Sequence, residues 1–254
     1  MSAVPALAGL GAAVALVALA FGRGGFHLST VPVALGVWLA LATLVIVAHA
    51  RRRERRFGTA NLVTAVRAGI VAVLAGLVPD AARLAEPAMV PWLWAATALA
   101  LVALVLDGVD GWIARRRGES SSFGARFDME TDAALGLVMA LLIWRSGETG
   151  AWVLGLGTLR YLFVAASWRW SALGGELYPS LRRKTVCVVQ IGALAAMLSP
   201  LVSAPASTAV GGVALALLVG SFARDATWLL RGGTRAKSGR GARAAGAGPV
   251  GGSA

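Results

Sequence analysis

The chain has 254 residues, of which 57% are hydrophobic and 14% are charged, and its formal net charge is +12. A soluble domain carries about 25% charged residues, so this composition excludes an ordinary soluble enzyme. The apolar runs are continuous rather than alternating, which argues against a membrane β-barrel and indicates membrane-spanning helices. Cys187 is the one cysteine, so a disulfide framework is excluded, and we expect it to be a small core or lipid-facing residue.

Eight apolar runs approach the roughly 20 residues needed to cross a bilayer. In chain order, we predict membrane-spanning helices at residues 3–21, 30–49, 60–78, 90–114, 124–144, 151–170, 184–200 and 205–230. No basic segment precedes the first run, so we expect a retained span and not a cleaved signal peptide. The predicted fold class is an all-α polytopic membrane protein.

Basic residues gather at one end of these predicted spans. They lie at 51–56, 115–117, 126 and 182–184 and in the segment after 231. Because cytoplasmic loops are enriched in Lys and Arg, we expect this end and both termini in the cytoplasm, with the protein in the plasma or inner membrane of the cell. A basic protein can also bind nucleic acid, but clusters at the ends of apolar runs favour contact with membrane lipids, so no nucleic-acid partner is expected.

The basic stretch at 51–56 also indicates a boundary between parts of the chain. We predict a two-helix N-terminal addition at residues 1–56 and a six-helix transmembrane core at 57–231. The remaining segment, 232–254, is rich in Gly, Ala and Arg and is predicted to be a disordered cytoplasmic tail. The role of the first two helices is left open.

Four aspartates lie near the membrane surface within the core, at Asp107, Asp110, Asp128 and Asp132. Spacings of three and four place each pair on one helix face, and the short connection between the pairs predicts antiparallel neighbouring helices. A single aspartate can simply be a charge at a helix end, but four like charges at close range repel unless a cation lies among them. Oxygen ligands suit Mg²⁺ or Mn²⁺, and four carboxylates can hold two ions.

The residues between the aspartates suit phosphate chemistry. Gly111 leaves room for a bulky ligand beside Asp110, and Arg115 can donate two hydrogen bonds to phosphate oxygens. The whole stretch, residues 107–132, resembles the signature of the CDP-alcohol phosphotransferase family, DxxDGxxARx8GxxxDxxxD, and agrees with it at every fixed position.

This resemblance implies an enzyme of phospholipid biosynthesis, a transferase of substituted phosphate groups. Members move a phosphoryl-alcohol (phosphatidyl) group from a CDP-alcohol such as CDP-diacylglycerol to an acceptor hydroxyl, and CMP leaves. By resemblance, Asp107, Asp110 and Asp128 ligate two metal ions, and Asp132 is both a ligand and the general base. The resemblance also implies a homodimer and identifies 57–231 as the family's six-helix core.

Other segments resemble the same family. Asn61, Thr64 and Arg67 are similar to the N-x-x-T-x-x-R start of its first core helix, where the Asn-to-Thr segment contacts the cytidine nucleotide; Asn61 is equally typical of a helix N-cap. Gly111, Arg115 and Ser121 occupy positions that contact the nucleotide in the family.

The basic residues of the later spans are candidates for binding the acceptor. Arg182, Arg183 and Lys184, followed by Thr185 and Gln190, are similar to the K-T-…-Q entry of the fifth core helix. These three basic residues are candidates to bind a phosphorylated acceptor or lipid headgroups, although the cytoplasmic charge bias explains them as well.

Arg160 falls in the middle of a predicted span. A charged residue there faces a cavity or a carboxylate, so we expect Arg160 to line the acceptor pocket or to pair with an acidic residue such as Glu130.

Two alternative functions remain open. A cation-conducting transporter would place the acidic cluster near mid-membrane and would release no CMP, whereas a catalytically silent scaffold would lack one of the key aspartates. The sequence leaves open the acceptor alcohol, and whether the lipid or the headgroup carries CDP.

Overall fold

The computed structural model describes residues 3–27, 29–51, 57–117, 121–175 and 180–245. Within these ranges the chain forms eight α-helices and four 3₁₀ helices, with no strand. The α-helices are α1 (Ala3–Arg23), α2 (Thr30–Arg51), α3 (Thr59–Leu77), α4 (Val90–Arg117), α5 (Ser122–Arg145), α6 (Leu154–Arg169), α7 (Leu181–Leu198) and α8 (Ala206–Ala245). The 3₁₀ helices are η1 (Val78–Ala85), η2 (Pro87–Met89), η3 (Ala151–Val153) and η4 (Ser171–Gly174). The predicted all-α membrane fold is confirmed.

Six helices of the described ranges are long and apolar enough to cross a membrane: α1, α2, α3, α4, α6 and α8. The sequence predicts eight spans, and the two that fall short are α5 and α7. Charged residues near their starts interrupt the apolar run in both, namely Asp128, Glu130 and Asp132 in α5 and Arg182, Arg183 and Lys184 in α7. Both helices nevertheless belong to the bundle, since α5 packs against α3, α6 and α7, and α7 packs against α4 and α8.

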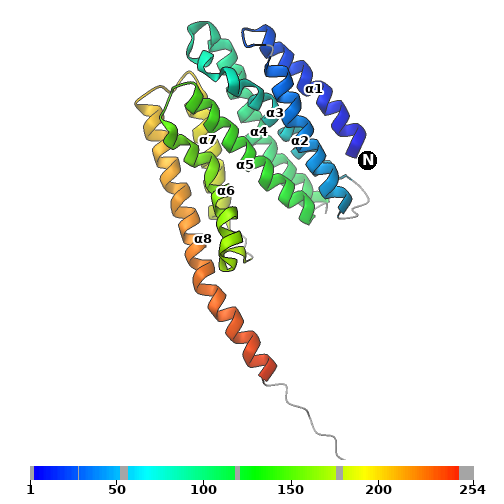
Figure 1. Cartoon of the computed structure of the whole chain (residues 1–254), viewed down its shortest axis with the longest axis vertical. Coiled ribbons are helices and arrows are strands. Elements are labelled where there is room, and N and C mark those ends of the chain that lie inside the picture. The colour runs from blue at the N-terminus through cyan, green and yellow to red at the C-terminus, as the bar shows by residue number, and fades with distance from the viewer. Residues whose placement is uncertain (1–2, 28, 52–56, 118–120, 176–179, 246–254) are drawn as a thin grey trace, which may run out of the picture.

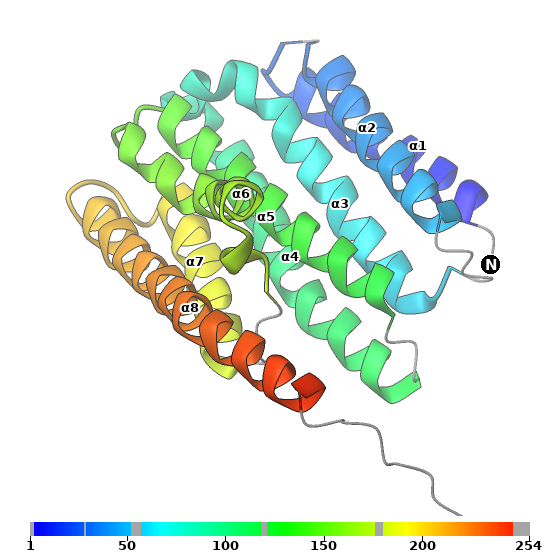
Figure 2. The same cartoon turned by 60° about the horizontal axis from the view of Figure 1, so that its bottom comes forward.

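The central helix of the bundle is α3, which packs against α1, α2, α4 and α5 (Figures 1 and 2). Every residue of α3 from 67 to 77 is buried, as expected for a helix that is apolar on all sides. Gly76 lets α2 approach closely: a Cβ atom there would lie 2.7 Å from the carbonyl oxygen of Thr30. The N-terminal pair α1 and α2 is therefore packed tightly against the helix at the centre of the molecule.

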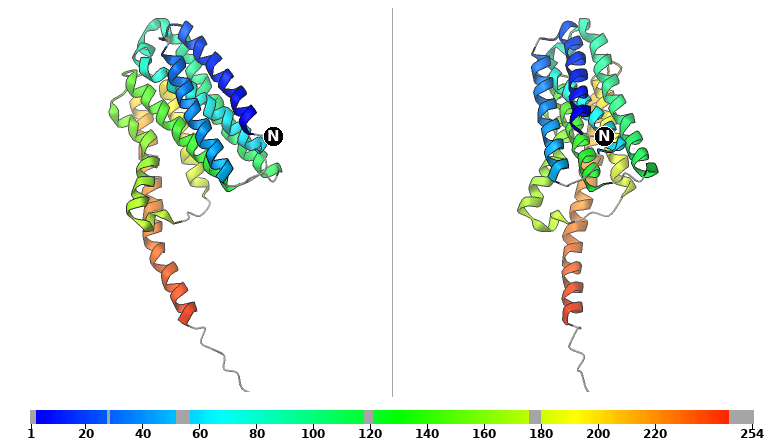
Figure 3. Two further views of the ribbon diagram at one scale, coloured as in Figure 1. Left: turned by 45° about the vertical axis from the view of Figure 1, so that its right-hand side comes forward. Right: turned by 90° about the vertical axis from the view of Figure 1, so that its right-hand side faces the viewer.

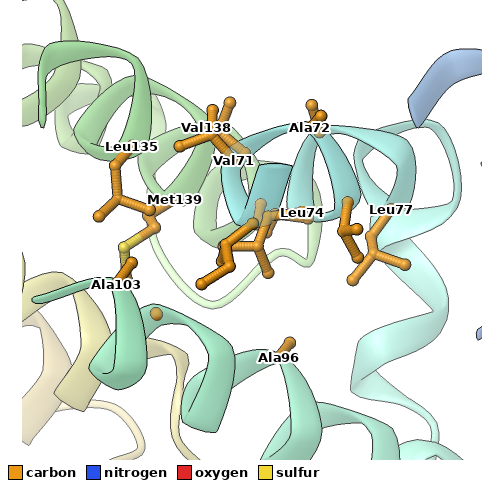
Figure 4. Packing of buried hydrophobic residues seen from close by; sticks show 14 of the residues in the cluster. Val71, Ala72, Leu74, Leu77, Ala96, Ala103, Leu135, Val138 and Met139 are labelled. Carbon is orange, nitrogen blue, oxygen red and sulfur yellow. The ribbon is translucent and has the colours of Figure 1, made fainter. Parts of the chain in front are cut away.

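The core between α3, α4 and α5 combines large side chains with alanines (Figure 4). Small residues at a helix interface let the backbones approach closely, and the alanines of α4 serve this purpose. The buried side chains shown there include Val71, Leu74 and Leu77 of α3, Ala96 and Ala103 of α4, and Leu135, Val138 and Met139 of α5. This packing fixes the three helices relative to one another.

The last helix, α8, continues past the other helices of the bundle (Figures 1 and 3). It packs against α6 and α7 and is helical to Ala245, so it includes residues 232–245 of the segment for which the composition predicts disorder. Residues 246–254 lie outside the described part of the chain. The division into parts at 1–56, 57–231 and 232–254 stays a prediction.

Candidate active site

The four aspartates converge, although the helices that carry them are not direct neighbours. Asp107 and Asp110 lie in the second half of α4, and Asp128 and Asp132 lie in the first half of α5. The expectation that α4 and α5 pack against each other is wrong: the two have little direct contact, and α3 and α7 each pack against both. The short connection only keeps the end of α4 close to the start of α5. The small side chains of α4 favour its packing against α3.

The side chain of Arg67, from α3, fills the space between the two acidic pairs. Its Nη1 atom lies 2.8 Å from Oδ2 of Asp110 and 2.5 Å from Oδ1 of Asp128. Its Nη2 atom lies 3.1 Å from Oδ1 of Asp107 and also contacts Oδ1 of Asp132. One guanidinium group therefore contacts all four carboxylates.

The sequence analysis missed this role of Arg67. The four like charges predict a cation among the carboxylates, and the sequence suggested a metal ion for it. Arg67 is predicted only as the last residue of the N-x-x-T-x-x-R segment. A usable signal was present, because Arg67 follows Thr64 by three residues and so shares its helix face. An arginine in an apolar span that also contains no acidic residue needs a carboxylate from another helix.

Three of the aspartates form a group that suits a metal ion. Asp107, Asp110 and Asp128 each offer one carboxylate oxygen, and these three oxygens lie within 4.8 Å of one another. An all-oxygen ligand set of this kind fits a hard divalent cation such as Mg²⁺ or Mn²⁺. Asp132 is outside this group but adjoins it, since Arg67 contacts Asp132 as well.

One polar residue of α3 contacts the acidic cluster, and a second lies where α3 and α5 approach closely. The hydroxyl of Thr64 donates a hydrogen bond to Oδ2 of Asp110 over 3.0 Å. Asn61 is buried, and its Oδ1 atom lies 2.8 Å from where a Cβ atom on Gly124 would be, so α5 approaches α3 closely at this glycine. The alternative that Asn61 caps the helix is wrong, because α3 begins at Thr59 and its N-cap residue is Gly58.

The other predicted nucleotide contacts lie around the same end of α4 and α5. Ser121 caps α5, its hydroxyl accepting a hydrogen bond from the backbone N–H of Gly124 over 3.0 Å. Arg115 is exposed, and its Nη1 atom lies 3.3 Å from where a Cβ atom on Gly111 would be. Their contact with a nucleotide stays a prediction.

Three of the four candidate acceptor residues have side-chain partners in the structure. Arg160 pairs with Glu130 over 2.5 Å, which is one of the two outcomes expected for it. Arg182 donates to the hydroxyl of Ser221 over 2.5 Å and to Oδ1 of Asp225 over the same distance.

The buried carboxylate of Asp225 holds a second arginine. Arg183 lies 3.7 Å from the same Oδ1 atom, Asp225 is 4% exposed, and Lys184 is exposed. The sequence analysis missed Asp225, although an isolated acidic residue within the apolar run of α8 could have been noticed.

Cys187 also lies at the site, and not in the core or facing lipid as expected. Its sulfur atom is 3.7 Å from Oδ2 of Asp132, within reach of a weak S–H hydrogen bond. Gln190, three residues later, donates to the carbonyl oxygen of Leu156 over 2.5 Å and so ties α7 to α6. These two contacts hold the middle of α7 beside the acidic cluster and against α6.

Comparison with known proteins agrees with the site. A model of the CDP-alcohol phosphatidyltransferase family matches residues 57–221. No curated protein and no solved structure was found to match the chain. The matched segment covers most of the chain, includes the four aspartates, Asn61 and Arg67, and ends just before Asp225. The chain belongs to the CDP-alcohol phosphatidyltransferase family, a family of membrane transferases of phosphoalcohol groups.

Proposed function

We propose that the protein is a divalent-metal-dependent transferase of phospholipid biosynthesis. It moves a phosphatidyl group from a CDP-alcohol such as CDP-diacylglycerol to an acceptor hydroxyl, and CMP is released. The observation that carries this proposal is the convergence of four carboxylates from α4 and α5 beside the buried polar residues Asn61 and Thr64 of α3.

The acidic cluster is the proposed site for the donor diphosphate. One or two Mg²⁺ or Mn²⁺ ions, held by Asp107, Asp110 and Asp128, would neutralise charge on the diphosphate and on the departing CMP. Thr64 orients Asp110 through its hydrogen bond, and Arg115 is free to reach phosphate oxygens because it is exposed. The amide of Asn61 is available to a nucleotide that enters at this end of the bundle.

Asp132 is the proposed general base. One of its oxygens contacts Arg67, and the other faces Cys187, while the side chain is 21% exposed and so accessible to a substrate. A hydroxyl group is too weakly acidic to attack unaided, so a positioned carboxylate accepts its proton. The hydroxyl oxygen then bonds to the phosphorus of the phosphatidyl group as the phosphorus–oxygen bond to CMP breaks.

For the acceptor, Arg183 is a candidate because of its place on α7. It precedes Cys187 by four residues, which places both on one face of α7, and Cys187 contacts the proposed base. Arg160 pairs with Glu130, whereas Arg182 and Arg183 both pair with Asp225. An anionic acceptor, such as a phosphorylated alcohol, would fit this basic surface.

A lipid donor is favoured by an apolar groove between α7 and α8. The groove has a volume of about 440 Å³ and is lined by Val189, Ala193, Ala209, Val210, Val213 and Ala214. Val189 lies two residues beyond Cys187 and so on another face of α7, and an acyl chain in the groove would have to pass around α7 for its phosphate to reach the acidic cluster. Because the groove is apolar, we favour CDP-diacylglycerol over a CDP-linked headgroup.

The cation transporter is a weaker candidate. A transport path would have to continue past the aspartates between α3, α4 and α5, and these helices are packed there by apolar side chains (Figure 4). The bias of basic residues supports placing the acidic cluster at the cytoplasmic face of the plasma or inner membrane. A homodimer is proposed from family membership alone.

The test is CMP release by the full-length protein in lipid vesicles. CDP-diacylglycerol is supplied with free or phosphorylated alcohols, and CDP-linked headgroups are supplied with diacylglycerol, each with Mg²⁺ or with EDTA. We expect CMP only with Mg²⁺ and only with one donor class. A folded protein that releases no CMP with any pair, and that passes cations through the vesicle membrane, contradicts the proposal and favours the transporter.

A further inference from the structure

Arg67 lies beneath the acidic cluster, on its buried side. Its side chain is 1% exposed, whereas the side chains of Asp107 and Asp128 are 29% and 36% exposed. A metal ion or a substrate must therefore approach from the side of the carboxylates, opposite Arg67. The guanidinium group is part of the protein's interior and is not a surface charge that solvent can screen.

Each of the four carboxylates has one oxygen in contact with a terminal nitrogen of Arg67. These oxygens are Oδ1 of Asp107, Oδ2 of Asp110, Oδ1 of Asp128 and Oδ1 of Asp132. Arg67 lies on the buried side of these carboxylates, so it can stay in place when a cation binds the exposed side. Its Nε atom is buried and has no hydrogen-bond partner, so the carboxylate contacts, made by the two terminal nitrogens, anchor the group.

The charges of the four carboxylates and of Arg67 affect both their mutual repulsion and the binding of a cation. When ionised, the four carboxylates carry four negative charges, and Arg67 contributes one positive charge, which leaves a net charge of −3. Removing Arg67 would leave −4 in the same space and would increase the repulsion among the carboxylates. The same positive charge repels an incoming divalent cation, and charges a few ångströms apart interact strongly in a buried site.

We propose that Arg67 is a positioning residue that acts as a resident counter-cation. It holds the four aspartates together in the metal-free protein, and by its charge it weakens their affinity for the divalent metal ion. This inference rests on the proposed metal site. A purely structural arginine would link α3 to α4 and α5 without any effect on metal affinity, so the two roles give different results.

The experiment measures Mn²⁺ binding and thermal unfolding of the full-length protein in detergent. Mn²⁺ binding is followed by electron paramagnetic resonance, and melting is followed in EDTA and in saturating Mn²⁺. We expect Arg67→Met to bind Mn²⁺ about tenfold more tightly than the wild type, because a repulsive charge is removed. We expect it to melt about 5 °C or more below the wild type in EDTA and to recover most of that loss with Mn²⁺, since tighter binding to the folded state stabilises it more.

Two further variants separate charge from shape. Arg67→Lys keeps the charge, and we expect its Mn²⁺ affinity to stay close to that of the wild type. Arg83→Met is the matched control: Arg83 lies in η1, which follows the far end of α3, contacts the carbonyl oxygen of Gly25 and pairs with Glu86. It should shift the melting temperature equally with and without Mn²⁺ and leave the affinity unchanged.

Should Arg67→Met not fold, the double variant Arg67→Met with Asp132→Asn decides. It keeps the three oxygens of the metal group and restores a net charge of −3, so it should fold in EDTA and bind Mn²⁺ close to the wild-type affinity. Failure of the double variant to fold, weaker Mn²⁺ binding by Arg67→Met, or an equal loss of melting temperature in both conditions overturns the inference. A wild type that binds no Mn²⁺ refutes the metal site itself, whereas binding that Arg67→Met leaves unchanged refutes only the role of Arg67.

Discussion

Cys187 of α7 places its sulfur atom 3.7 Å from Oδ2 of Asp132 on α5. This contact joins the only cysteine of the chain to the proposed general base. A thiol is a weak hydrogen-bond donor, so its contribution to the orientation of the carboxylate is modest. We expect Cys187→Ala to lower kcat about two- to tenfold with little change in KM, as for the loss of one hydrogen bond. Cys187→Ser should restore kcat; equal losses in both variants would show that the contact does not orient Asp132.

Replacing the proposed base should separate chemistry from metal binding. Asp132→Asn keeps the size of the side chain but removes its ability to accept a proton, so we expect CMP release to fall about 100-fold or more. Mn²⁺ binding should persist in part, because Asp132 lies outside the group of three oxygens. Steady-state CMP release and Mn²⁺ titration measure the two effects. Normal turnover in this variant would refute the assignment of Asp132 as the base.

Replacing a proposed metal ligand should remove both properties together. We expect Asp107→Ala to lose Mn²⁺ affinity and CMP release in parallel, because its carboxylate belongs to the group of three. Asp80→Asn is the matched control, since Asp80 lies in η1 and contacts the backbone N–H of His27 over 3.1 Å at the far end of α3. Loss of activity with intact Mn²⁺ binding in Asp107→Ala would place the metal ion elsewhere.

The close approach at Gly124 gives a test of the nucleotide side of the site. The Cβ atom of Gly124→Ala would lie 2.8 Å from Oδ1 of Asn61, so Asn61 or the start of α5 must move. We expect a rise in KM for the CDP donor and a loss of about 1–3 kcal/mol in the free energy of unfolding. Asn61→Ala combined with Gly124→Ala should regain stability but not the low KM. An unchanged KM in Gly124→Ala would argue against a nucleotide at Asn61.

The pairing of α7 with α8 through Asp225 predicts an effect on the acceptor. Asp225→Asn weakens the hold on Arg182 and Arg183, so we expect a higher KM for an anionic acceptor and an unchanged KM for the CDP donor. The free energy of unfolding should fall by about 1–3 kcal/mol, because a buried charged hydrogen bond is lost. Glu86→Gln, which removes an exposed ion pair with Arg83, should change neither quantity measurably. Equal effects on both substrates would indicate a general loss of structure.

The sequence predicted the features that depend on local patterns. Apolar runs located all eight helices, and the spacing of the aspartates placed each pair on one helix face. The contacts that complete the site depend on how distant helices pack, which local sequence patterns do not reveal. Arg67, Cys187 and Asp225 reach the site from α3, α7 and α8, and no regular spacing connects them to the aspartates. The assumption that a short connection makes α4 and α5 direct neighbours was wrong for the same reason.

The contacts between Arg67 and the four aspartates bear on how the protein is made. A carboxylate at the centre of a membrane-spanning helix costs roughly 2.5–3.5 kcal/mol, and charged residues within membrane segments commonly pair with an opposite charge. Arg67 precedes both acidic pairs in the chain, so α3 is synthesised before α4 and α5. The positive charge that pairs with the four aspartates is therefore already present when these helices are made. The order of the helices thus allows the bundle to assemble without a metal ion.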